Sequence, residues 1–265
     1  MLEKKIVNNR KLAKALIIEG KVRVGNKVVD KPGALIPAGA DIDLNLDNSY
    51  VSRGGTKLEG CFKDFNLSAE GIDAIDVGSS TGGFTDFLLR KGVKRVIAID
   101  VGYGQLSWKL RQSPHVFVFE RTNIRYLDIE KLPFYSDLTV VDVSFISIKK
   151  IFQKVLDITK QGKKILLLVK PQFELKKEEV QEKGIITDSN LHGRVLKRIA
   201  IFFNHFPVLV EDITFSKIKG TKGNIEYWIY LTKSAKGKEN IKNYDKMIND
   251  IVEKSHCFFN KKERE

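Results

Sequence analysis

The chain has 265 residues, which is enough for one substantial α/β domain and a small additional unit. Hydrophobic residues make up 42% of it, and its net charge is +13 at pH 7, so it is typical of a globular protein that is attracted to polyanions such as nucleic acid. The two cysteines have no metal-ligand spacing and are too few for a disulfide framework, which predicts no metal site and a reducing, cytoplasmic environment. No segment approaches the roughly 20 apolar residues that span a bilayer, so we expect no membrane partner.

The first predicted unit is small and basic and covers residues 1–47. Residues 9–20 place apolar side chains on one helical face and end in a glycine, which predicts a short amphipathic helix. Residues 21–30 alternate valine with charge around a Gly-Asn pair, which predicts a β-hairpin, and residues 41–46 predict a closing strand.

Cations gather on both the predicted helix and the predicted hairpin of this unit. They could simply face solvent, but we favour phosphate contact because two elements supply them. The candidate RNA-binding residues are Arg10, Lys11, Lys14, Lys21, Arg23 and Lys27. With its basic helix, Gly-Lys-Val step and hairpin, the unit partially resembles the α-L RNA-binding motif first seen in a ribosomal small-subunit protein.

A second domain is expected at residues 69–265, after a segment at 48–68 that holds the linker and the start of the catalytic domain. Short apolar runs rich in Val and Ile alternate with helical patterns there, which is typical of a doubly wound, Rossmann-like α/β sheet. The expected parallel strands are residues 74–77, 96–100, 116–119, 138–143 and 164–169. The expected helices are residues 84–89, 106–111, 148–159 and 191–206, with a last helix near 244–259. Residues 208–214 and 225–232 flank a loop at 217–223 and predict an antiparallel hairpin at the sheet edge.

The segment DVGSSTGGFT, residues 76–85, joins a predicted strand to a predicted helix. It lacks both the G-x-G-x-x-G pattern of dinucleotide sites and the phosphate loop, and the carboxylate of Asp76 would repel a pyrophosphate. S-adenosylmethionine has no phosphate and carries a sulfonium and an ammonium group, so an acidic, glycine-rich turn suits it in charge and shape. The alternative is an ordinary turn whose glycines only pack helix on strand.

Three further polar residues follow the second and third predicted strands. Asp100 comes about two dozen residues after the glycine turn, close to the roughly 20 at which an acid binds ribose hydroxyls in doubly wound folds; otherwise it would cap the next turn. Asn123 and Asp128 lie where an adenine would be expected, although either could serve a turn. The candidate cofactor-binding residues are Asp76, Gly78, Ser79, Ser80, Thr81, Gly82, Gly83, Phe84, Asp100, Asn123 and Asp128.

Four charged residues form a candidate catalytic cluster. Asp142 and Lys170 each close an apolar strand, which is an unusual position for a charge, whereas Glu226 begins the last strand and Lys57 lies beside a glycine pair. Methyl transfer from a sulfonium is an in-line displacement, so the protein need only position an oxygen and remove its proton, without a metal. Lys170 could act as base only if burial or a nearby cation such as Lys57 favoured its uncharged form, with Asp142 and Glu226 orienting the ammonium groups.

Six segments are similar to the motifs of the TlyA family, and the likeness extends over nearly the whole chain. They are SRGGTKL (52–58), DVGSSTGGFT (76–85), DVGYGQL (100–106), VDVSFIS (141–147), VKPQFE (169–174) and GNIE (223–226). That family joins an α-L RNA-binding motif to an FtsJ-like methyltransferase domain and methylates ribose 2′-hydroxyls of cytidines in ribosomal RNA. The resemblance implies Lys57, Asp142, Lys170 and Glu226 as a catalytic tetrad, S-adenosylmethionine as cofactor, and ribosomal RNA or ribosomal subunits as partner.

Two other functions compete with this interpretation. A non-catalytic RNA-binding or ribosome-assembly factor could retain the cofactor fold, but the intact Asp142 and Lys170 favour an enzyme. Some family members carry the name hemolysin, but the chain lacks the long apolar or strongly amphipathic segment of a membrane-active protein.

Overall fold

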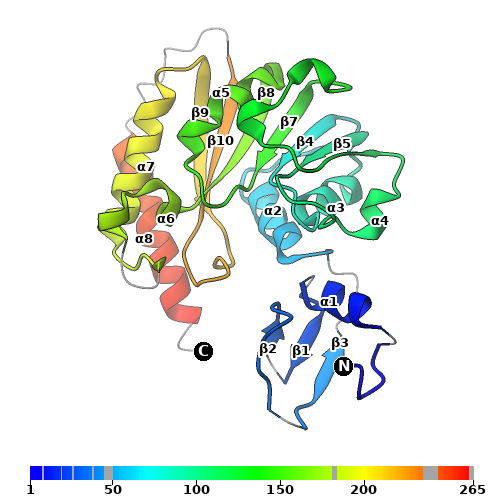
Figure 1. Ribbon diagram of the computed structural model, residues 1–265. Coiled ribbons are helices and arrows are strands. Elements are labelled where there is room, and N and C mark those ends of the chain that lie inside the picture. The colour runs from blue at the N-terminus through cyan, green and yellow to red at the C-terminus, as the bar shows by residue number, and fades with distance from the viewer. Residues whose placement is uncertain are drawn as a thin grey trace.

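A computed structural model describes residues 1–7, 9–18, 20–25, 27–37, 39–44, 50–180, 184–234 and 244–262. It contains a small N-terminal unit and a larger α/β domain, and the small unit lies at the lower end of the molecule in Figure 1. The N-terminus and the end of the last described helix (Tyr244–Lys262) both lie toward that end.

The N-terminal unit combines one helix with a three-stranded antiparallel sheet. Its elements are α1 (Arg10–Ile18), β1 (Val22–Val24), β2 (Lys27–Val29) and β3 (Ile42–Leu44). β1 is the central strand and pairs with both neighbours, so the predicted helix, hairpin and closing strand are all present. Glu19, Asn26 and residues 45–47 of this predicted unit lie outside the described residues.

A seven-stranded sheet forms the centre of the larger domain. Its strands are β4 (Asp73–Val77), β5 (Arg95–Ile99), β6 (Val116–Phe119), β7 (Ser136–Val141), β8 (Thr159–Val169), β9 (Val208–Phe215) and β10 (Tyr227–Lys233). They are arranged in the order β6-β5-β4-β7-β8-β10-β9. Strands β4 to β8 are parallel to one another, whereas β10 runs antiparallel to both β8 and β9. The predicted edge hairpin is therefore confirmed, with β9 outermost and the antiparallel strand β10 one position inside.

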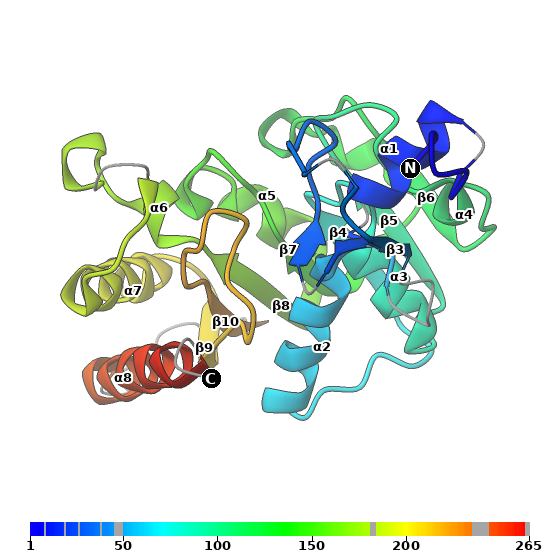
Figure 2. The ribbon, with the colours of Figure 1, turned by 90° about the horizontal axis from the view of Figure 1, so that it is seen from below.

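Helices cover both faces of this sheet (Figure 2). Besides short helices α4 (Trp108–Arg111) and α6 (Pro171–Glu174), they are α2 (Arg53–Asp64), α3 (Gly83–Arg90), α5 (Phe152–Asp157), α7 (Ser189–Phe203) and α8 (Tyr244–Lys262). Side chains alternate along the strands, so Ala74 packs with the core of α2 and α3, while Ile75 packs with the core of α5, α7 and α8. Among the described helices, none is both long and apolar enough to cross a bilayer.

Helix α2 lies in residues 48–68, where the sequence predicts a linker and the start of the catalytic domain. Its glycine pair obscured it, because glycine is a poor helix former. A side chain at Gly55 would overlap the ring of Tyr50, and one at Gly83 would come within 2.9 Å of the Gly55 nitrogen. These glycines therefore let the first turns of α2 and α3 pack closely. The available signals were the N-cap at Ser52, whose side chain accepts a hydrogen bond from the Gly54 nitrogen, and apolar residues at helical spacing: Leu58, Cys61 and Phe62.

The predicted helix at residues 148–159 is divided in the structure. A 3-10 turn at Ile148–Lys150 precedes α5, and Thr159 already begins β8, which is longer than the predicted strand at 164–169. Thr159 is buried and its hydroxyl is bonded to that of Thr139 on β7 and to the carbonyl of Val155. Thr159 is therefore held in β8 by a contact with the neighbouring strand. The periodicity of residues 148–159 does not contain this contact, so it predicted a helix that continues to Thr159.

Candidate active site

Topology brings distant charged residues to one edge of the sheet. Asp142 directly follows β7, and Lys170 directly follows β8, so both lie at the carboxyl edge of the parallel strands. Because β10 runs the other way, Glu226, which directly precedes it, lies at the same edge. Ligands of doubly wound sheets bind at this edge, next to the point where the strand order reverses.

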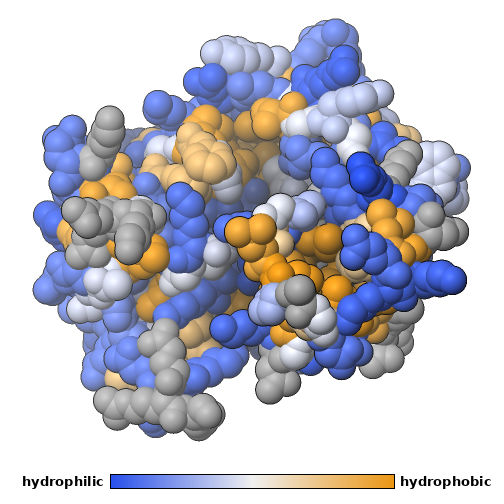
Figure 3. Space-filling view, turned by 60° about the horizontal axis from the view of Figure 1, so that its bottom comes forward, coloured by the Kyte–Doolittle hydropathy of each residue, from blue (hydrophilic) through white to orange (hydrophobic). Residues whose placement is uncertain are grey.

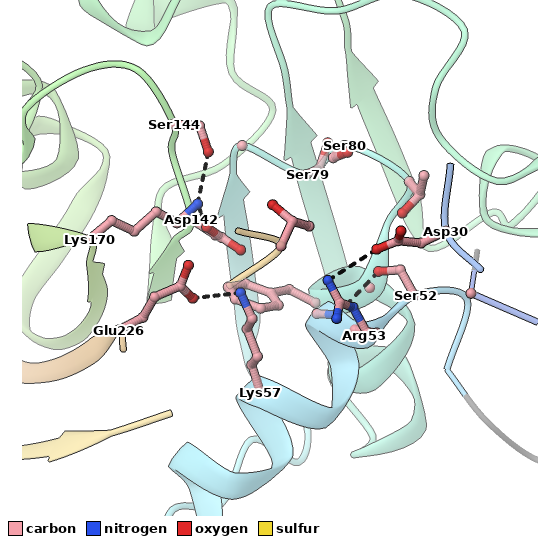
Figure 4. A pocket seen from close by; sticks show the side chains of 17 residues that line it. Asp30, Ser52, Arg53, Lys57, Ser79, Ser80, Asp142, Ser144, Lys170 and Glu226 are labelled. Carbon is pink, nitrogen blue, oxygen red and sulfur yellow. Dashed lines mark hydrogen bonds and ion pairs between the residues drawn. The ribbon is translucent and has the colours of Figure 1, made fainter. Parts of the chain in front are cut away.

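The four candidate catalytic residues form two ion pairs in one cavity (Figure 4). The Lys57 Nζ lies 2.6 Å from Glu226 Oε2, and the Lys170 Nζ lies 2.5 Å from Asp142 Oδ1. Lys170 also donates a hydrogen bond of 2.9 Å to the Ser144 hydroxyl. The two lysine side chains are each 10% exposed, and the cavity has a volume of about 310 Å³. The four charged residues, which come from separate motifs in the sequence, thus lie beside one another in the structure.

Electrostatics favour the charged forms of Lys57 and Asp142. Burial acts to lower the pKa of Lys57, but the carboxylates of Asp142 and Glu226 outweigh it and raise that pKa above its ordinary value. Burial acts to raise the pKa of Asp142, but Lys170 and Lys57 outweigh it and hold that pKa below its ordinary value. Lys57 is therefore a fixed cation, and Asp142 is a fixed anion that faces both lysines.

The glycine turn after β4 lines two adjoining cavities. Ser79, Thr81, Gly83 and Phe84 line the cavity that holds the tetrad. Gly78 and Ser80 line both that cavity and a second one of about 540 Å³, which also includes Asp100 and Asn123. Gly78 has φ +87°, and a side chain there would overlap the carbonyl oxygen of Asp142, so glycine is needed for this turn to pack so closely against the chain that follows β7.

Asp100 joins the two loops at the mouth of the second cavity. Its carboxylate accepts one hydrogen bond of 2.8 Å from the Ser80 nitrogen and one of 2.7 Å from the Gly102 nitrogen. Asp100 therefore does cap the turn that follows β5, which was the alternative to ribose binding. A carboxylate has about four lone-pair sites, so it can accept ribose hydroxyls in addition. The roomy second cavity, its carboxylate and the glycine turn in its wall fit a cationic, ribose-bearing cofactor.

Three candidate cofactor residues lie away from these cavities. Asp76 is fully buried inside β4, where its carboxylate accepts hydrogen bonds from the nitrogen and hydroxyl of Thr85 at the start of α3. Burial raises the pKa of Asp76 to about 7. Gly82 has φ +97° and packs against Leu110. Asp128 caps a 3-10 turn and lines a neighbouring cavity that also contains Asn123.

Several residues that line the site were not singled out from the sequence. Arg53 forms a 3.2 Å ion pair with Asp30 of the N-terminal unit, so the tetrad cavity has walls from both units. Ser144 follows Asp142 by two positions and bonds Lys170. Phe145 lines the second cavity and has a left-handed backbone with φ 64°, as does the predicted cofactor residue Ser80 with φ 48°, and such strain is frequent in functional loops. The available signal for Ser144 was its polar side chain two positions after Asp142, shortly after the end of β7.

The candidate RNA-binding cations lie on the predicted helix and hairpin. Arg10, Lys14, Arg23 and Lys27 are exposed, and Lys21 is half-buried. Lys11 belongs to α1, but its side chain lies outside the described residues. Figure 3 shows the end of the molecule that carries the N-terminal unit, where hydrophilic side chains surround separate apolar patches and the surface is hollowed near its centre.

A doubly wound sheet with one antiparallel strand next to its edge, an acid-flanked glycine turn and a carboxylate after β5 is typical of S-adenosylmethionine-dependent methyltransferases. Residues 50–233 match the FtsJ-like methyltransferase family, and residues 1–42 match the S4 domain. The chain belongs to the TlyA family of FtsJ-like methyltransferases, as its motifs predicted, and it is an enzyme of that class.

Relatives support this placement over most of the chain. The chain is 36% identical to the 16S/23S rRNA (cytidine-2′-O)-methyltransferase TlyA of Mycobacterium tuberculosis, with 87% of each chain covered. It is 38% identical to Hemolysin A of Brachyspira hyodysenteriae, with 83% of this chain and 92% of that protein covered. A solved structure of a Streptococcus thermophilus protein, described as a candidate hemolysin, is 37% identical with a TM-score of 0.80 and covers 98% of this chain and 94% of that one.

Proposed function

We propose that this chain transfers a methyl group from S-adenosylmethionine to a ribose 2′-hydroxyl, that of a cytidine, in ribosomal RNA. The observation that carries the proposal is the pair of lysine–carboxylate contacts in a cavity that shares the wall residues Gly78 and Ser80 with a second cavity of about 540 Å³. The relative named as an rRNA (cytidine-2′-O)-methyltransferase supports the choice of acceptor. Such a substrate would place the enzyme in the cytoplasm.

The chain's own residues would hold the cofactor and prepare the hydroxyl. Asp100 and the backbone of the glycine turn would bind the cofactor's ribose and amino-acid part, and Asn123 would lie beside its base. When bound, S-adenosylmethionine supplies an electrophilic methyl group on a sulfonium. Lys170, held between Asp142 and Ser144, would take the proton of the ribose hydroxyl or hold that hydroxyl for a partner to deprotonate. The cation of Lys57, fixed by Glu226, would stabilise negative charge that develops on the oxygen.

The N-terminal unit would supply phosphate attraction, which predicts a change in salt dependence. Replacing Arg10, Lys14 and Arg23 together by Ala should reduce the slope of log affinity against log salt for a ribosomal RNA fragment. Each true phosphate contact contributes about 0.9 to that slope on a duplex and about 0.7 on a single strand. Fluorescence anisotropy at several salt concentrations measures it.

A matched control removes three exposed cations elsewhere. Replacing Lys246, Lys254 and Lys261 of α8 by Ala changes the net charge equally, and we expect the slope to stay near that of the wild type. An unchanged slope in the N-terminal variant would mean that RNA docks elsewhere, such as on the loop at residues 217–222.

Methyl transfer to ribosomal RNA tests the function directly. We expect radiolabelled methyl groups to appear at a 2′-hydroxyl when the protein, S-adenosylmethionine and ribosomal subunits are mixed, and mapping in cells with and without the protein should show the same site. Binding to ribosomal RNA without transfer would instead support the non-catalytic assembly factor. Lysis of erythrocytes by the purified protein, without methyl transfer, would support the hemolysin.

A further inference from the structure

Asn224 is a buried polar residue beside the active site that the proposed chemistry does not use. It belongs to the GNIE segment, in the loop that joins β9 to β10, and its exposed fraction is 1%. Burying a carboxamide is costly unless its hydrogen-bonding groups are satisfied, so its partners show what it stabilises.

The Asn224 side chain joins its own loop to a second loop. Its Oδ1 accepts a hydrogen bond of 2.7 Å from the Ile186 nitrogen, and its Nδ2 donates one of 2.8 Å to the Gly184 carbonyl. Both ends of the carboxamide therefore bind backbone 38 to 40 residues away in the chain. A shorter side chain would leave two backbone groups without these partners.

The Asn224 main chain closes the turn that leads to Glu226. Its carbonyl accepts a hydrogen bond of 2.9 Å from the Gly220 nitrogen, and the Glu226 carbonyl accepts one of 2.8 Å from the Ser216 nitrogen. The Glu226 carboxylate lies against the α-carbon of Gly220, where a side chain would overlap Oε1. This carboxylate is thus confined by Gly220 on one side and paired with Lys57 on another.

We infer that Asn224 is a positioning residue, which sets the place of the Glu226 carboxylate, and through it that of Lys57, by fastening the β9–β10 loop to residues 184–186. This inference rests on the proposed function, because it assigns Asn224 a role in the same reaction. A role in folding alone would stabilise the loop without acting through Glu226, and the two roles make different predictions.

A double-mutant cycle in single-turnover methyl transfer separates them. Asn224→Ala should lower the rate constant by about 100-fold, the loss that a misplacement of about 1 Å can cause. In a Glu226→Gln background the same substitution should cause less than a twofold further loss, because the group that it positions is already gone. The dissociation constant for S-adenosylmethionine should stay within about twofold of the wild type. Asn249→Ala, exposed on α8, is the matched control and should leave the rate unchanged.

A second variant keeps the test valid if Asn224→Ala unfolds. Gly220→Ala leaves Asn224 intact and places a Cβ where the Glu226 carboxylate lies, so it should lower the rate similarly and again be non-additive with Glu226→Gln. If each substitution lowered the rate constant by the same factor in the wild type and in the Glu226→Gln background, in both cycles, the inference would be overturned and the proposed function would stand. A wild-type protein that transfers no methyl group to ribosomal RNA would overturn both.

Discussion

Lys170→Arg is expected to lose methyl transfer by about 100- to 10,000-fold in single turnover, the range typical of a missing general base. A guanidinium cannot be deprotonated in proteins, so arginine keeps the charge beside Asp142 but cannot accept a proton. Affinity for S-adenosylmethionine should stay near that of the wild type, because Lys170 lines the tetrad cavity and not the second cavity. Rapid-quench measurement with saturating cofactor and RNA gives the rate constant.

The pH profile adds a second readout for Lys170. The wild-type rate constant should rise with pH, because a base works in its deprotonated form, whereas that of Lys170→Arg should be flat. Asp142 cannot produce this rise, because the two lysines overcome the effect of burial and hold its pKa below the ordinary value, so it is already ionised at neutral pH. Lys150→Arg, at an exposed position, is the matched control. Near-normal rates for Lys170→Arg would leave that residue an electrostatic role, and Asp142 would become the candidate base.

Two substitutions on the cofactor side should remove or weaken binding of S-adenosylmethionine. Gly78→Val forces a branched side chain onto a backbone with φ +87° and into the carbonyl oxygen of Asp142, so calorimetry should detect no binding. Asp100→Ala removes charge-assisted hydrogen bonds, each worth about 1.5–3 kcal/mol, so affinity should fall about 10- to 100-fold for each bond to the cofactor.

Controls must show that these variants still fold. Asp250→Ala removes an exposed carboxylate of α8 and should bind the cofactor as the wild type does. Circular dichroism should show similar helix content for all three variants. Binding by both Gly78→Val and Asp100→Ala at wild-type affinity would mean that the cofactor lies elsewhere.

Much of the fold follows from local pattern. Parallel strands covered on both faces need nearly continuous apolar residues, so runs such as residues 164–169 predict them directly. Hairpins and glycine turns depend on the conformational preferences of a few neighbouring residues, which explains why the β9–β10 hairpin and the turn after β4 could be predicted. Helix α2 was not predicted, since its glycine pair is explained by the close approach of Tyr50 and Gly83.

The sequence by itself determined the class of fold and the residue types available at the strand ends, because burial and periodicity act over a few neighbouring positions. Only the tertiary structure decided which of those residues meet. Lys57 and Glu226 are 169 positions apart, and their contact depends on the packing of α2 and on the reversed direction of β10. The placement of residues 184–186 against the β9–β10 loop likewise gives the Asn224 side chain its partners at Gly184 and Ile186. Such contacts arise from strand order and helix packing, which connect segments whose own sequences carry no information about each other.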